Sequence, residues 1–116
     1  MIQRNAFFAI VWAYVWLVAQ YAIATPPWQI PDEPAHYNYV RFVAEHAAIP
    51  VLNSGDYNQA YLEVIKAQKF PDAMSIDSIR YESHQPPLYY LVMTPFYLAG
   101  KTAPQAERLI GLRLAS

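Results

Sequence analysis

The chain has 116 residues, about the size of one domain, and only 15% of them are charged, compared with about 25% in an average soluble domain. Hydrophobic residues make up 55% and aromatic residues 16%, so contact with a membrane is expected. The formal net charge of -1 argues against nucleic-acid binding, and the absence of cysteine excludes disulfides, thiolate metal sites and cysteine nucleophiles.

The first predicted element is a membrane-spanning helix that ends at Ala24. No formal charge occurs from Ala6 to Ala24, and at about 1.5 Å per residue this run reaches roughly 28 Å, close to the thickness of a hydrocarbon core. Arg4 precedes it, so the positive-inside rule predicts a cytoplasmic amino terminus and an extracytoplasmic continuation. Ala22-Ile23-Ala24 also has the pattern of a cleavable secretory signal. The run exceeds the usual signal core of roughly 7 to 15 residues, so we expect an uncleaved anchor.

A proline-rich corner, residues 25–31, follows the anchor and cannot continue the helix. A second helix is then predicted to run to about Ala48. Asp32 is its expected N-cap, Glu33 interacts with the helix dipole, and Pro34 lies in the first turn. The predicted buried face contains Ala35, Tyr39, Phe42, Val43 and His46, whereas Tyr37, Arg41 and Glu45 fall elsewhere.

Two further helical segments are expected before the last one. An amphipathic stretch runs from about Asn58 to Phe70, and a polar loop follows from Pro71 to Ser83. From Gln85 to Gly100 there is again no formal charge, but Pro95 interrupts the run and leaves roughly 21 Å of helix. Because this is too short to span a bilayer, we expect an interfacial or re-entrant helix.

The last segment, Thr102-Ala103-Pro104-Gln105, predicts a capping box and the start of another helix. That helix meets Ser116 without a C-cap, which predicts that the natural protein continues. The expected fold is therefore an all-α membrane protein. Residues 1–24 form the cytoplasmic end and first transmembrane helix, residues 25–101 an extracytoplasmic loop with interfacial helices, and residues 102–116 the start of a second transmembrane helix.

The densest polar cluster consists of Asp32, Glu33 and His36, just outside the predicted membrane. Asp32 and Glu33 precede His36 by four and three residues, so on a helix both carboxylates lie on the same face as His36. A carboxylate at this depth suits a general base that acts on a lipid-borne substrate, or a group that binds an acceptor. A purely structural N-cap with a surface histidine is the alternative. A divalent metal site is a further possibility that this spacing does not specify.

A second polar cluster, residues 82–90, precedes the short apolar helix. Its His84 and Gln85 are candidates to contact a lipid phosphate or sugar hydroxyls, and Tyr89 is a candidate to stack on a sugar ring. Alternatively, the two prolines only start a helix whose tyrosines form an interfacial belt. Arginines are candidate phosphate partners as well, Arg41 among them, whereas Arg108 and Arg113 are interpreted as ordinary boundary cations.

Three segments together resemble the amino-terminal part of polytopic membrane glycosyltransferases of the glycosyltransferase C superfamily. They are "PPWQIPDEPAHYNYVRFVAE" after the first anchor, "ESHQPPLYYLVMTPFYLAG" and "AERLIGLRLAS". The enzymes that the chain resembles are relatives of the protein O-mannosyltransferases and the lipid A aminoarabinose transferases. The resemblance covers nearly the whole chain. It implies transfer of a sugar from a polyprenyl phosphate to a protein, lipid or glycan hydroxyl outside the cytoplasm, usually with inversion.

The resemblance also implies roles for individual residues. The acidic position of the first loop maps to Asp32, with Glu33 beside it, as the base or acceptor-binding group. Many relatives have a lysine before the two prolines that contacts the donor phosphate. Here that position is Gln85, preceded by His84, so we expect His84 and Arg41 near the leaving phosphate. One spanning helix and a loop do not enclose a lipid-linked sugar, so the chain by itself is expected to be inactive.

Two readings from other classes stay open. One is a small single-pass membrane protein whose outer helices bind a partner or lie on the bilayer. The other is a secreted binding domain that follows a cleaved signal. Neither would need a lipid-linked sugar donor.

Overall fold

The computed structural model describes residues 2–116, with side chains from Arg4 onward. Within this range the chain is all-helical and has no strand, as the sequence predicts. Its elements are α1 (Ile2–Ala24), α2 (Glu33–His46), α3 (Gln59–Ala67), the 3-10 helix η1 (Tyr81–His84), α4 (Leu88–Ala99) and α5 (Gln105–Ala115).

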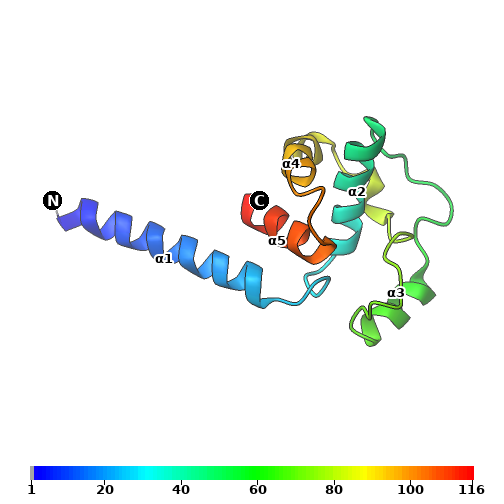
Figure 1. Ribbon diagram of the computed structural model, residues 1–116, viewed down its shortest axis with the longest axis horizontal. Coiled ribbons are helices and arrows are strands. Elements are labelled where there is room, and N and C mark those ends of the chain that lie inside the picture. Colours follow the sequence, from blue (N-terminus) through cyan, green and yellow to red (C-terminus); the bar gives the residue numbers. More distant parts are fainter. Residues whose placement is uncertain (1) are drawn as a thin grey trace.

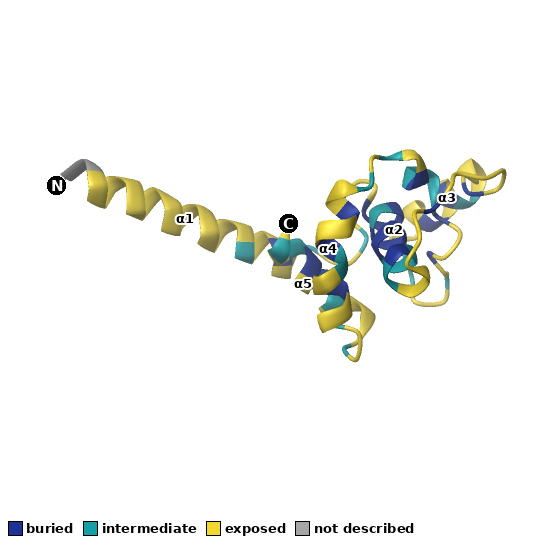
Figure 2. Cartoon of the chain, turned by 90° about the horizontal axis from the view of Figure 1, so that it is seen from above, coloured by how far each residue is buried: buried dark blue, intermediate teal, exposed yellow. Residues whose placement is uncertain are grey.

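Helix α1 projects away from the other elements, which form a compact head around α2 (Figure 1). Its segment Arg4–Ala24 is long and apolar enough to cross a membrane, judged by length and composition. Figure 2 shows this helix exposed along nearly its whole length, and Ala22 is its one buried residue among the side chains described. The apolar surface of α1 therefore has almost no protein partner within the described chain.

Helix α2 is the centre of the head, with buried residues on most of its circumference. Figure 2 shows the buried segments gathered around it. Tyr37 is only 3% exposed, although the periodicity placed it outside the buried face, and His46 is exposed. The reason is that α2 packs against α4 and η1. The buried hydrophobic cluster comprises Ala35, Tyr37, Tyr39, Val40, Val43, Leu62, Ile65, Ile76, Ile79, Tyr90, Met93, Tyr97, Leu109 and Leu112.

The segment predicted as a polar loop, residues 71–83, supplies part of this core. Ile76 and Ile79 are 5% and 4% exposed. The buried Asn38 amide donates hydrogen bonds to both of their carbonyl oxygens, at 2.7 Å and 2.9 Å. Asn38 thereby fixes this loop against α2, and the loop holds η1 in place next to the start of α2.

Helices α4 and α5 have different directions relative to α1. Figure 1 shows α4 nearly end-on, so its axis lies across that of α1, whereas α5 runs back alongside the carboxyl end of α1. Pro95 lies inside α4 and does not end it. The predicted capping box is wrong: Pro104, rather than Thr102, occupies the N-cap position of α5, and no side chain caps this helix.

Candidate functional site

Glu33 and Arg113 form a buried ion pair at the junction of three helices. The Arg113 guanidinium donates from Nε to Glu33 Oε1 at 2.6 Å and from a terminal nitrogen to Oε2 at 2.8 Å. The two side chains are only 7% and 9% exposed. Two parallel hydrogen bonds of this kind are stronger and more directional than a simple charge contact.

The same guanidinium satisfies backbone carbonyls at the end of α1. It donates to the carbonyl oxygens of Ala22, Thr25 and Pro26, at 2.9 Å, 2.6 Å and 3.1 Å. These groups lie where a helix has no intrahelical donors left and where its dipole attracts a cation. Arg113 is therefore enclosed in the fold, and its interpretation as an ordinary boundary cation is wrong.

Arg108 is likewise held within the head. It donates to the carbonyl oxygens of Gly100, Lys101 and Ala103, and its guanidinium carbon lies 4.8 Å from the centre of the Tyr97 ring. No local sequence pattern indicates these contacts, because the partners lie 5 to 11 positions before Arg108, across the turn between α4 and α5. Both arginines are therefore already occupied by the protein itself.

Asp32 lies beside the buried pair but has a different environment. It is exposed, and its backbone is left-handed with φ of 60°. Its side chain makes no capping hydrogen bond to α2, which corrects the predicted N-cap role, because this backbone conformation differs from the extended one that capping side chains use. The carboxylate instead accepts a hydrogen bond from the Tyr81 hydroxyl at Oδ1, at 2.7 Å.

Tyr81 comes from η1 and holds one carboxylate oxygen of Asp32. Burial raises the pKa of Tyr81, and the hydrogen bond to Asp32 raises it further. The phenol therefore remains a proton donor at physiological pH and orients the carboxylate. The second oxygen, Oδ2, receives no hydrogen bond from the described residues and is available to a ligand.

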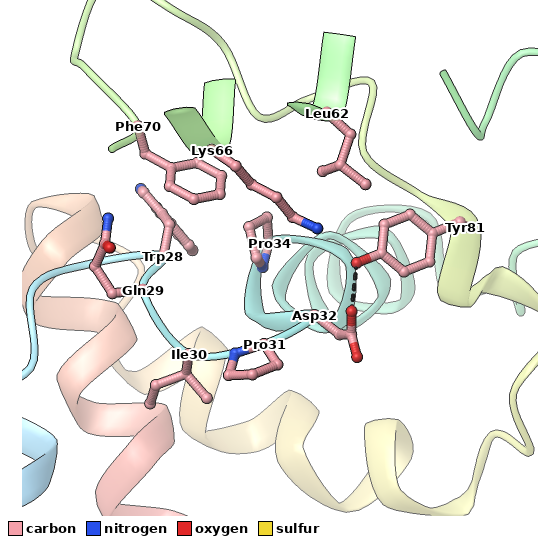
Figure 3. Close-up of a pocket in the computed structure, with 10 residues that line it drawn as sticks. All are labelled: Trp28, Gln29, Ile30, Pro31, Asp32, Pro34, Leu62, Lys66, Phe70 and Tyr81. Carbon is pink, nitrogen blue, oxygen red and sulfur yellow. Dashed lines mark hydrogen bonds between the residues drawn. The ribbon is translucent and has the colours of Figure 1, made fainter. Parts of the chain in front are cut away.

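Asp32 and Tyr81 line a pocket of 250 Å³ between the proline-rich corner, α2 and α3. Figure 3 shows Lys66 extending from α3 along Pro34 toward the Asp32 and Tyr81 pair, with Trp28 and Phe70 at the other end. Lys66 forms no ion pair with any described carboxylate. The pocket thus combines a carboxylate, an ammonium group and aromatic surface.

The backbone around this pocket is strained. Of the five non-glycine residues with positive φ in the described chain, three line the pocket: Trp28 at 67°, Asp32 at 60° and Phe70 at 54°. Each left-handed residue costs roughly 1–2 kcal/mol, and such strain tends to cluster at functional sites. Trp28 is held by a hydrogen bond from its backbone N–H to Glu33 Oε2, at 2.8 Å, and by edge-to-face packing on Tyr37. The buried ion pair therefore also positions a wall of the pocket.

His36 and Tyr89 lie outside this pocket. They line a smaller hollow of 70 Å³ next to Glu33 and Arg113. His36 Nδ1 is 2.8 Å from the Tyr90 hydroxyl, and the two rings are stacked. Tyr89 is 49% exposed, so its ring is open to solvent or a ligand.

The other residues predicted to contact the substrate lie outside the pocket of Asp32; they are His84, Gln85 and Arg41. His84 is exposed, and its Nδ1 donates to the Tyr81 carbonyl oxygen at 2.9 Å. The Gln85 side chain donates to Glu82 at 2.8 Å. Arg41 pairs with Asp77 at 2.7 Å and does not line the pocket of Asp32. The structure therefore separates Arg41 from Asp32, whereas η1 links the His84 segment to it through Tyr81.

Sequence reasoning missed three residues of the pocket. Tyr81 immediately precedes the second polar cluster, so extending that cluster by one residue would have included it. Trp28 lies in the proline-rich corner, residues 25–31, and Lys66 lies in the amphipathic stretch from Asn58 to Phe70. Neither has a local signal that points to Asp32.

The described residues contain no cluster of three or more histidine or acidic side chains suited to a metal ion. No family model, curated protein sequence or solved structure matches the chain. The chemistry of the pocket is therefore argued from its own residues. An exposed carboxylate, oriented by a phenol in a pocket that an exposed lysine also lines, is suited to accept a proton from a hydroxyl while an anion is held nearby.

Proposed function

We propose that this chain forms the membrane anchor and first extracytoplasmic loop of an integral membrane glycosyltransferase. The enzyme would transfer a sugar from a polyprenyl phosphate to an acceptor hydroxyl. The observation that supports it most is Asp32, which is exposed, oriented by Tyr81, and located just beyond the end of the apolar helix α1. A base that serves a lipid-linked substrate must lie at this boundary.

The arrangement of the helices agrees with this proposal. If α1 spans the bilayer, α4 lies across it and along the membrane surface, where its exposed Leu88, Val92 and Phe96 contact lipid. Helix α5 returns toward the membrane beside α1, as the start of a second span would. With α1 in the bilayer, the pocket beside the proline-rich corner would lie at the lipid boundary, as the proposal requires.

In this mechanism Asp32 accepts the proton of the acceptor hydroxyl. The hydroxyl oxygen bonds to the anomeric carbon, the bond from that carbon to the phosphate oxygen breaks, and polyprenyl phosphate leaves with the electron pair. Both oxygens of Glu33 are already occupied by Arg113 and Trp28. We therefore assign the base to Asp32 alone and give Glu33 a positioning role.

Asp32→Asn tests this assignment, because the amide keeps the shape of the side chain but cannot accept the proton. Membranes from cells that express the natural gene are supplied with a polyprenyl phosphate carrying a radiolabelled sugar, and transfer is measured. We expect a loss of roughly 100-fold or more, the usual contribution of a general base. Asp72→Asn, an exposed aspartate outside the pocket, is the matched control. Equal transfer by Asp32→Asn and wild type would refute the assignment and favour a non-catalytic membrane protein.

A further inference from the structure

The proposed function does not use the motif Ala22-Ile23-Ala24 at the end of α1. A signal peptidase recognises small residues at the first and third positions of such a motif and cleaves after the third, here between Ala24 and Thr25. Ala24 is the last residue of α1, and its side chain is exposed. If α1 spans the membrane with Arg4 inside, this bond lies at the outer boundary, where a signal peptidase acts. The motif and its depth therefore both suit cleavage.

The backbone on both sides of this bond is already engaged in hydrogen bonds. The Thr25 N–H, which belongs to the bond itself, donates to the Tyr21 carbonyl oxygen at 3.1 Å and keeps the last turn of α1 closed. The Arg113 guanidinium holds three carbonyl oxygens around the bond, those of Ala22, Thr25 and Pro26. A peptide that binds by adding a strand to the edge of a sheet must be extended, with these groups free. Cleavage therefore requires that the last turn of α1 opens and that Arg113 leaves.

The side chain of the first alanine is covered as well. Ala22 is 3% exposed, and α5 runs alongside this end of α1 (Figure 1). Arg113 is itself only 7% exposed and is held by both carboxylate oxygens of Glu33. Opening the motif therefore separates Arg113 from Glu33. A buried pair resists this separation, because the charge that remains is uncompensated.

We propose that Ala22-Ile23-Ala24 is a signal-peptidase site that the fold masks, and that Arg113 is the residue that keeps α1 attached to the head. Cleavage breaks the bond between the Ala24 carbonyl carbon and the Thr25 nitrogen. Water supplies the hydroxyl of the new Ala24 carboxyl group and the proton of the new Thr25 amine, and the head loses its anchor. Retention of α1 does not depend on sugar transfer, so a failure of either proposal leaves the other intact.

The experiment exposes the folded chain to the enzyme directly. The full chain in dodecylmaltoside micelles is incubated with a purified type I signal peptidase, and the products are identified by mass spectrometry. The parent chain should remain intact. Arg113→Met should be cleaved between Ala24 and Thr25 at least about 100-fold faster, because loss of one partner of a buried ion pair raises the population of the open state by this order. Ala24→Leu in the Arg113→Met chain removes the small residue before the bond and should stop this cleavage.

Arg80→Met is the matched control for general destabilisation of the head. Arg80 pairs with Asp56, whose side chain is 5% exposed, and its guanidinium forms no hydrogen bond with α1 or the proline-rich corner within the described chain. Glu33→Gln is a milder second variant, which retains Arg113 but removes the charge that holds it. Circular dichroism reports whether each variant remains folded.

We expect Arg113→Met and, to a smaller extent, Glu33→Gln to be cleaved faster than Arg80→Met. If Arg113→Met does not remain folded, the comparison of Glu33→Gln with Arg80→Met tests the role of Arg113. Equal cleavage of these variants and Arg80→Met would mean that overall stability protects the bond, and would overturn that role. An Arg113→Met chain that stays intact, or is cleaved no faster than the parent, would overturn the masked site.

Discussion

The buried pair of Glu33 and Arg113 allows a quantitative test of how the site is held. The perturbation is Arg113→Met, which keeps much of the side-chain length but removes the guanidinium. Glu33 is then left buried, and among the described residues only the Trp28 N–H still donates to its carboxylate. The carbonyl oxygens of Ala22, Thr25 and Pro26 also lose their Arg113 hydrogen bonds.

The magnitude follows from the burial of both side chains. Removing one partner of a buried ion pair costs about 3–5 kcal/mol, because the remaining charge is uncompensated. A domain of this size has a free energy of unfolding of about 5–15 kcal/mol, so the variant should lose a large fraction of its stability. Arg113→Lys keeps the charge but not the paired geometry, so its cost should be smaller, about 1–3 kcal/mol.

The assay is urea unfolding of the full chain in dodecylmaltoside micelles, followed by circular dichroism. Arg41→Met is the control, because it breaks the pair with Asp77, whose side chain is 65% exposed. An exposed pair contributes about 0.2–1 kcal/mol. Hydrogen exchange at the first turn of α2 adds a local measurement, since this turn contains Glu33.

The double variant Glu33→Gln with Arg113→Met separates pairing from other effects. If the two side chains interact as the structure indicates, the double variant loses about 1–3 kcal/mol less than the sum of the single variants. A cost for Arg113→Met no larger than that for Arg41→Met, together with additive single variants, would show that the Glu33 and Arg113 pair does not stabilise the fold.

Two further outcomes concern the rest of the head. Ala47 ends α2 with a left-handed backbone, φ 50°, so Ala47→Gly should raise the free energy of unfolding by about 0.5–1 kcal/mol; an unchanged or lower urea midpoint would contradict this. Burial raises the pKa of Tyr97 to about 12, so the folded state favours its protonated phenol. Stability from this group is complete below about pH 10 and is lost as the pH rises through about 12. Unfolding followed by circular dichroism across this range should show the loss, and Tyr97→Phe should reduce its pH dependence.

Local sequence signals predicted the positions of the helices well. The charge-free run predicted the apolar helix that ends at Ala24, and the proline-rich corner predicted the break before α2. Asn58 was expected to open an amphipathic stretch, and its side chain caps α3 by accepting from the Tyr61 N–H. These features depend on residues within one or two turns, which is the range over which a sequence pattern is informative.

The site could be predicted only in part, because its contacts join distant segments. Asp32 was predicted as a site residue partly from its place after the apolar run, and that role remains a prediction; its partner Tyr81 is 49 residues away. Arg113 is 80 residues from Glu33, and nothing near either residue indicates a pair. Lys66 lines the pocket because the fold brings α3 to the side of the pocket opposite Asp32, where Pro34 also lines it. Periodicity also misplaced Tyr37, since helices that are surrounded by other elements have no single buried face.

The proposed function requires that Asp32 lies outside the cytoplasm at the lipid boundary. The chain has no cysteine, so single substitutions can be labelled without background. Asn5→Cys and Gln29→Cys, both exposed positions, are treated in intact cells with a membrane-impermeant maleimide. We expect that position 29 is labelled from outside and that position 5 is labelled only after permeabilisation. Labelling of position 5 from outside, or protection of position 29 until permeabilisation, would contradict it.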